Sequence, residues 1–248
     1  MGIFDRLFKH HNPPGGESPT PWDVECKARA AKFGYGQVPA SEVWAAFEQV
    51  VVPSCSGFLQ AKRGLLARQI NSDMFHLVSF GAGKGGIYGF RWGVSLAYVP
   101  HEWEEACKYH RTLKAVRFDL FEDPWEFLIE DLHSAEGWQY MADTLHGPTC
   151  FREDLARAWA NLSPVITTWF STVPDLPGVV SCANRHLRHN WRGFRHHPDP
   201  NLILAFTLAR LGKREEALTA LSELGRADSV GYGSEILKSA LDKTLAIQ

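Results

Sequence analysis

The sequence contains no C-x-x-C pair, and its five cysteines are widely separated along the chain. An odd number of dispersed cysteines is typical of reduced thiols in a cytosolic protein and not of a disulfide framework. The sequence also has no apolar run of the length that a membrane-spanning helix needs. Its first residues, MGIFDRLF, lack the apolar stretch of a secretory signal. We therefore predict a cytoplasmic protein without a membrane span.

An excess of charge of one sign is also missing. The formal net charge at pH 7 is -2, and the isoelectric point is near 6.6. This balance argues against a protein whose whole surface binds nucleic acid, and it confines any electrostatic partner site to one region. Hydrophobic residues make up 45% of the 248 residues, which is enough for a sizeable core.

Gly81, Gly83 and Gly86 have the spacing G-x-G-x-x-G, which is a feature of dinucleotide-binding loops. Such a loop needs a helix after the glycines, because the N-terminus of that helix binds the phosphate. Here the glycines are followed by IYGFRWGVSLAYV, whose aromatic and β-branched residues predict a strand. Lys84 precedes the last glycine, which does not fit a P-loop either. We predict a hairpin connection between two strands.

The periodicity of the whole chain predicts an α+β fold. We expect an antiparallel sheet with a flanking helix and a C-terminal helical bundle. The flanking helix begins at an N-cap, Ser41, and ends at Pro53. Strands are expected at residues 74–80, 87–99 and 114–121, with a short helix at 101–110. Further helices are expected at 152–162, at 200–224 and at the C-terminus. Pro164 interrupts the first of these helical patterns just after residue 162.

The apolar periodicity of residues 200–224 predicts two helices joined at Leu211, Gly212 and Lys213. With Ala205 and the sequence REEAL, this segment is similar to one tetratricopeptide-like αα-hairpin. A solenoid needs about three repeats, and the sequence holds no second copy. We expect an amphipathic N-terminal segment and flexible linker at 1–21, a sheet region at 22–148 and a helical region at 149–248 packed as one unit with the sheet.

No pattern in the sequence has the spacing of a complete metal site. Cys107 and His110 form one C-x-x-H without a second pair, and Glu105 stands where the H-E-x-x-H pattern requires histidine. The carboxylates of residues 119–131 are typical of a solvated face. We predict no metal, no cofactor and no catalytic residue. An enzyme whose site is assembled from distant residues stays open as an alternative.

Residues 184–200, NRHLRHNWRGFRHHPDP, form an arginine-rich strip with no lysine. Arginine and tryptophan are frequent anchors of protein interfaces, so we predict that the strip faces a partner with an acidic surface. The expected partner-binding residues are Arg185, Arg188, His189, Trp191, Arg192, Arg195 and His196. Two other interpretations stay open: Trp191 and Phe194 anchor the segment to the core while the arginines are solvated, or the arginines pair with the acidic residues 119–131 of the same chain.

The order of patterns resembles an uncharacterised bacterial family known only as a domain of unknown function. The resemblance covers residues 41–224 and rests on a helix ending before Gly57 and Phe58, the strand pair FHLVSFGAGKGGIYGFRWGVSLAYV and the sequence LAFTLARLGKREEAL. Such domains occur among immunity proteins of toxin systems. The resemblance implies a cytosolic binding module that neutralises a partner toxin by occlusion. The alternative is a nucleic-acid-associated protein that uses residues 184–200.

We expect ATP, GTP and NAD to leave the melting temperature of the protein unchanged. A loop between two strands has no helix N-terminus for phosphate, and a ligand raises the melting temperature only when it binds the folded state. A thermal-shift titration with each nucleotide is the measurement. A dose-dependent rise that Lys84→Ala abolishes would contradict the hairpin interpretation.

Overall fold

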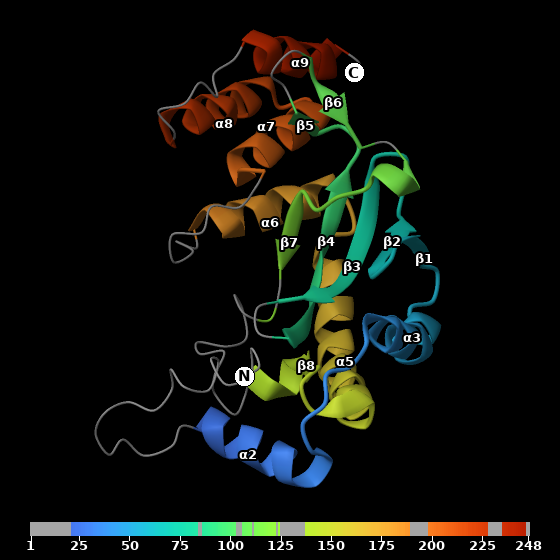
Figure 1. Cartoon of the computed structure of the whole chain (residues 1–248). Helices are drawn as coiled ribbons and strands as arrows, with labels where there is room; N and C mark the ends of the chain where they lie inside the picture. The colour runs from blue at the N-terminus through green and yellow to red at the C-terminus, as the bar shows by residue number, and fades with distance from the viewer. Residues whose placement is uncertain are drawn as a thin grey trace, which may run out of the picture.

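The computed structural model describes residues 21–83, 86–102, 106–110, 112–122, 124, 137–188, 198–227 and 235–246. The strands are β1 (Leu59–Lys62), β2 (Leu65–Gln69), β3 (Met74–Ala82), β4 (Ile87–Leu96), β5 (Pro100–Glu102), β6 (Lys108–Tyr109), β7 (Leu120–Glu122) and β8 (Met141–Asp143). The helices are α2 (Pro21–Phe33), α3 (Ala40–Val50), α5 (Gly147–Thr172), α6 (Leu176–Arg188), α7 (Pro200–Arg210), α8 (Arg214–Ala227) and α9 (Glu235–Ala246). Figure 1 shows the sheet in the middle of the molecule, α5 and α6 behind it and α7 to α9 above one end.

The main sheet is antiparallel, with the strand order β1-β2-β3-β4-β7, and β8 also pairs with β4. This confirms the predicted α+β class. The predicted hairpin is the pair β3–β4, which runs from Met74 opposite Leu96 to Ala82 opposite Tyr88. Gly86 has a φ of 81°, which favours glycine in this connection. Residues 84 and 85 lie outside the described residues.

One face of the sheet is buried by α3 and α5. Phe80 of β3 stacks on Phe47 of α3 with 5.3 Å between ring centroids, and Phe90 of β4 packs on Trp159 of α5 at 5.2 Å. The alternation of a strand places Phe80 and His76 on the same face. The ring of His76 stacks on Phe170 of α5 at 4.2 Å. Aromatic side chains from both layers therefore meet within the core.

The other face of the sheet is covered by a loop whose sequence pattern predicts a strand. Residues 114–121 alternate in sequence, but only Leu120–Glu122 is strand, and Leu113–Ala115 forms a 3-10 turn. Val116 packs with Phe75 and Leu77 on this second face. The Asp119 carboxylate accepts a hydrogen bond of 2.6 Å from the Leu96 amide. A side chain from this loop therefore satisfies a backbone amide of β4. The alternating pattern of residues 114–121 therefore belongs mostly to a loop that covers the sheet, and the predicted strand is limited to its end.

Three other expectations about local structure are corrected. The pattern of residues 101–110 predicts a helix, but β5 and β6 form a separate two-stranded sheet. Helix α3 begins at Ala40 after Pro39, and no side chain caps it, so Ser41 is not the N-cap. Pro164 lies inside α5 without ending it. The buried stripe of α5 continues on both sides through Leu162 and Ile166, so packing outweighs the lost hydrogen bond.

The C-terminal helices pack around α7. Helices α7 and α8 form the predicted pair, joined at Gly212, whose φ is 74°. Polar contacts tie this region to the sheet: the Tyr98 hydroxyl lies 3.1 Å from the Thr207 hydroxyl, Arg210 of α7 pairs with Asp73, and His76 Nε2 lies 3.0 Å from the Val173 carbonyl oxygen. Within the described residues, no helix combines the length and the apolar character needed to cross a membrane.

The contact between β4 and β7 depends on Gly93. A Cβ atom at this position would lie 2.0 Å from the Leu120 carbonyl oxygen and 2.7 Å from Phe121 Cα. We expect Gly93→Ala to lower the free energy of unfolding by about 3 kcal/mol, because β7 must move away. Gly81→Ala is the matched control, since a Cβ atom there would meet no atom within 4 Å beyond the neighbouring residues. Chemical denaturation measures both; equal stability of the two variants would contradict this account.

Candidate functional site

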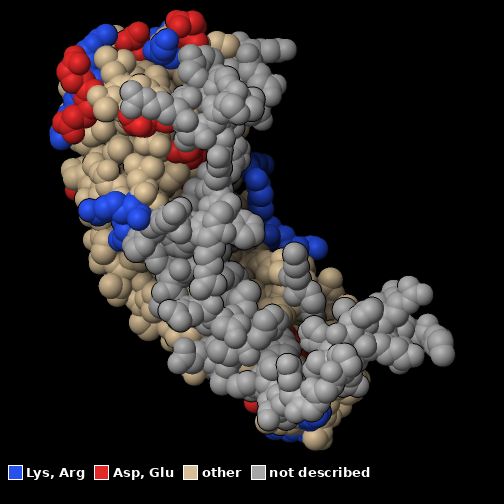
Figure 2. All heavy atoms as spheres, turned by 90° about the vertical axis from the view of Figure 1, so that its left-hand side faces the viewer, with Lys and Arg blue, Asp and Glu red and all other residues tan. Residues whose placement is uncertain are grey.

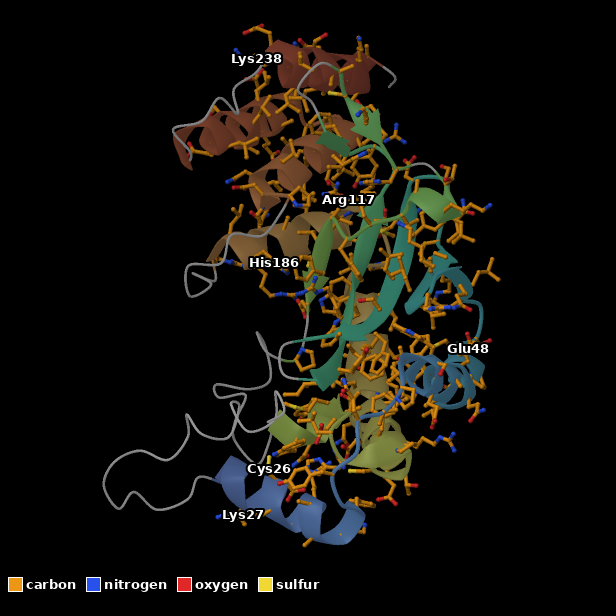
Figure 3. All side chains as sticks on the ribbon, viewed as in Figure 1. Cys26, Lys27, Glu48, Arg117, His186 and Lys238 are labelled. Carbon is orange, nitrogen blue, oxygen red and sulfur yellow. The ribbon has the colours of Figure 1, made fainter. Side chains whose placement is uncertain are left out.

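Helix α6 brings together the most unusual group of side chains in the described structure. Its apolar face buries Val179 and Ala183, and the same face carries Cys182 and His186 into the interior. The Asp175 carboxylate accepts a hydrogen bond of 2.9 Å from the Gly178 amide and so fixes the first turn. Figure 3 labels His186 on α6 where the helix passes β7. The helix therefore presents a sulfur atom and an imidazole to the end of the sheet.

Strand β7 supplies a buried carboxylate to the same place. Glu122 stands opposite Trp92 of β4, on the sheet face that α5 and α6 cover. Its Oε1 atom accepts a hydrogen bond of 2.6 Å from Arg185 Nη2 and lies 3.7 Å from His186 Nε2. Arg185 Nη2 also lies 3.5 Å from Cys182 Sγ. We call Glu122, Cys182, Arg185 and His186 the α6–β7 cluster.

The α6–β7 cluster contains three residue types that bind metals. Glu122, Cys182 and His186 are all buried, and their ligand atoms all lie within 4.8 Å of one another. Burial raises the pKa of the Cys182 thiol to about 12, against the opposing effect of Arg185. The thiol is therefore protonated at neutral pH and is a poor nucleophile by itself.

The predicted partner-binding residues fall into three groups. Arg185 pairs with Glu122, so for this arginine the structure supports the interpretation that it pairs with residues 119–131 of the same chain. Arg188 is exposed at the end of α6, and no described carboxylate pairs with it. The other five, His189, Trp191, Arg192, Arg195 and His196, lie outside the described residues. The nearby Leu187 is 40% exposed.

Figure 2 shows the side of the molecule on which α6 ends. Basic atoms lie at the height of α6 next to uncharged surface, and acidic atoms gather above them. Several acidic side chains of α8 and α9 have local partners: Arg214 pairs with Asp242 at 3.2 Å, Lys238 with Glu235 at 2.9 Å and Lys213 with Glu216 at 3.2 Å. The end of α6 differs from them because Arg188 has no such partner in the described part of the chain.

A second buried polar cluster lies where α2, β8 and α5 meet. Asp154 of α5 accepts a hydrogen bond of 2.5 Å from Arg29 Nη1 and one of 2.8 Å from Arg157 Nη1. Nearby, the Asp143 carboxylate bonds to His146 Nδ1. A carboxylate that orients an imidazole is also found at general bases. Both residues are buried here, however, and they lie at the junction that holds α2 against α5, so we interpret this cluster as structural.

A cavity of about 860 Å³ lies between the end of the sheet and helices α7 and α9. Cys107, Tyr98 and Lys243 line it, and its Arg210 is paired with Asp73. The volume suits a small molecule. Sequence reasoning missed the cavity because separate segments line it. His110, which shares the C-x-x-H pattern with Cys107, stacks instead on His101 with 3.9 Å between ring centroids.

Comparison of the chain with protein-family models, with curated proteins and with solved structures gives no match in any of the three. The resemblance to a bacterial immunity-associated family therefore stays a prediction. The α6–β7 cluster and the exposed end of α6 are the features on which a functional argument can rest.

The structural role of Asp154 can be tested by comparing its substitution with that of the adjacent, exposed Glu153. We expect Asp154→Ala to lower the free energy of unfolding by about 3 to 5 kcal/mol, because Arg29 then keeps a buried charge without its partner. Glu153→Ala should change it by less than about 0.5 kcal/mol, since the pair of Glu153 and Lys32 is exposed, at 3.4 Å. Denaturant unfolding measures both. Similar losses in the two variants would refute the interpretation of Asp154 as a buried anchor.

Proposed function

We propose that this chain is a bacterial binding module of the immunity type, which neutralises a partner toxin by occupying its working surface. The binding surface includes the last turn of α6. The observation that carries the proposal is the exposure of Leu187 beside Arg188, an apolar and a cationic side chain that are both available to a partner. Interfaces favour such a combination, because an apolar contact excludes water around a directional hydrogen-bonding group.

The rigid turn of α6 that precedes Leu187 and Arg188 favours binding. The preceding turn of α6 is fixed by the buried His186 and by the pair of Arg185 and Glu122. A side chain on a rigid element loses less conformational freedom when it binds, so more of the contact energy appears as affinity. The buried part of α6 thus holds Leu187 and Arg188 in place before a partner arrives.

The chemistry of the end of α6 favours an acidic protein surface. A guanidinium forms paired hydrogen bonds with a carboxylate in a fixed plane. The sequence after Arg188 contains Arg192 and Arg195 but no lysine as far as Pro200. A nucleic-acid binder also uses arginine and aromatic residues, and Trp191 in this sequence keeps nucleic acid as the second candidate. The two partners differ in how steeply binding falls with salt.

We expect Arg188→Glu to weaken capture of the protein partner at least tenfold, because a reversed charge repels an acidic surface. Arg63→Glu is the matched control, as Arg63 is also exposed but lies in the turn between β1 and β2. The experiment immobilises each variant, captures proteins from nuclease-treated extract of the native cells and identifies them by mass spectrometry. Melting temperatures should agree among the variants.

Neutralisation is then tested directly. The captured protein, produced alone in a heterologous bacterium, should stop growth; co-production of the wild-type chain or of Arg63→Glu should restore it, and Arg188→Glu should not. A captured protein that is harmless on its own, or equal rescue by all variants, would refute the proposal. Binding that nuclease treatment removes would favour the nucleic-acid alternative.

A further inference from the structure

We infer that Glu122, Cys182 and His186 form a site for one divalent transition-metal ion of the zinc type. The inference rests on their placement: a strand residue and two helix residues, distant in sequence, put an oxygen, a sulfur and a nitrogen atom within 4.8 Å of one another in the interior. It is independent of the partner surface proposed above.

Local geometry explains why these residues converge. Cys182 and His186 are four positions apart on α6, so their side chains point from the same helix face. Glu122 faces them from the end of β7 because strand alternation turns residues 120 and 122 to the side that α6 covers. The i, i+4 spacing is visible in the sequence, but the third residue is about sixty positions away, and only the fold supplies it.

The three ligand atoms, one sulfur, one nitrogen and one oxygen, determine which class of metal ion the site would bind. Thiolate and imidazole ligands suit zinc and related ions, whereas magnesium and calcium prefer oxygen ligands. Ligand atoms in a tetrahedral zinc site are about 3.3 to 3.8 Å apart, given metal–ligand bonds of about 2.0 to 2.3 Å. The distance of 3.7 Å between His186 Nε2 and Glu122 Oε1 already falls in that range. Three protein ligands leave a fourth position for water or another ligand.

Arg185 acts as a positioning residue for the carboxylate. Its guanidinium donates to Glu122 Oε1, and each oxygen of an ionised carboxylate has two lone pairs, so Oε1 can bind a metal ion and keep this hydrogen bond. Metal binding replaces the proton of the Cys182 thiol: the sulfur keeps its electron pair and bonds to the ion, and the proton passes to solvent. The side chain of Arg185 is 34% exposed, so the cluster lies close to the surface of the described structure.

The test uses the full chain, purified without a histidine tag and stripped of metal with a chelator. Titration with zinc against a coloured competing chelator should show one tightly bound ion per chain. Cobalt, used as a spectroscopic probe, should give the charge-transfer absorption of a thiolate ligand and the visible bands of a tetrahedral site. Zinc should also raise the melting temperature, because it binds the folded state.

Variants assign the ion to these residues. Cys182→Ala and Glu122→Gln should each weaken zinc binding at least tenfold, and Cys182→Ala should abolish the charge-transfer absorption. Cys55→Ser is the matched control, because Cys55 is half-buried and lies before β1, away from α6; its zinc binding should equal that of the wild type. Circular dichroism checks that each variant is folded, and Cys182→Ser replaces Cys182→Ala if the latter does not fold.

Two results would overturn the inference. The first is a wild-type chain that binds no zinc when the competing chelator is removed. The second is binding that survives both Cys182→Ala and His186→Gln, which would assign the ion to other histidines of the sequence such as His189, His196 and His197. A wild-type cobalt spectrum without thiolate absorption contradicts the site even if every variant unfolds.

Discussion

Strand β4 pairs with three other strands of the described structure, and the positions of β7, β8 and the elements that follow them depend on it. It pairs with β3 along its length, and its other edge is divided between β8, opposite residues 87–89, and β7, opposite residues 92–94. The β8 half leads into α5 through Gly147, and the β7 half ends at Glu122 beneath α6. One strand therefore fixes the position of the central helix and that of the buried carboxylate, and Gly93 makes the close approach of β7 possible.

Helix α6 has two parts with different surroundings. The buried part carries Cys182 and His186 to Glu122, where mixed donor atoms gather in a region of low dielectric constant. The last turn carries Leu187 and Arg188 into solvent. Arg185 lies between these parts: it is paired with Glu122 but partly exposed. Any change in the charge of the buried part is therefore felt by a residue next to the proposed partner surface.

Local patterns in the sequence predict the elements whose structure is determined locally. The β3–β4 hairpin follows from glycines between two strand-like segments, and the α7–α8 pair follows from Gly212 between two helical periods. The predictions from sequence are wrong where tertiary packing determines the local structure. Residues 113–118 alternate because they cover Phe75 and Leu77, and α5 continues through Pro164 because its apolar stripe stays buried on both sides. The sequence alone cannot show these contacts.

The candidate site was predictable only in part. The arginine-rich composition of residues 184–200 draws attention to the end of α6, and the structure separates two of its arginines into an internally paired one and an exposed one. Nothing in the pattern relates Cys182 and His186 to Glu122, since the relation depends on which face of β7 meets α6. The C-x-x-H spacing of Cys107 and His110 has no second pair in the sequence, and in the structure Cys107 lines a cavity while His110 stacks on His101.

The polar links between the sheet and the C-terminal helices have a consequence for how the molecule unfolds. Tyr98 meets Thr207, His76 meets the Val173 carbonyl group, and Arg210 meets Asp73 across the same boundary. If the helices separated while the sheet stayed folded, several buried polar groups would lose their partners together with the apolar contacts, and each such loss is costly. A half-folded intermediate is therefore strongly disfavoured. The boundary near residue 149 divides two kinds of sequence pattern, but these contacts cross it, so we expect the two sides to unfold together.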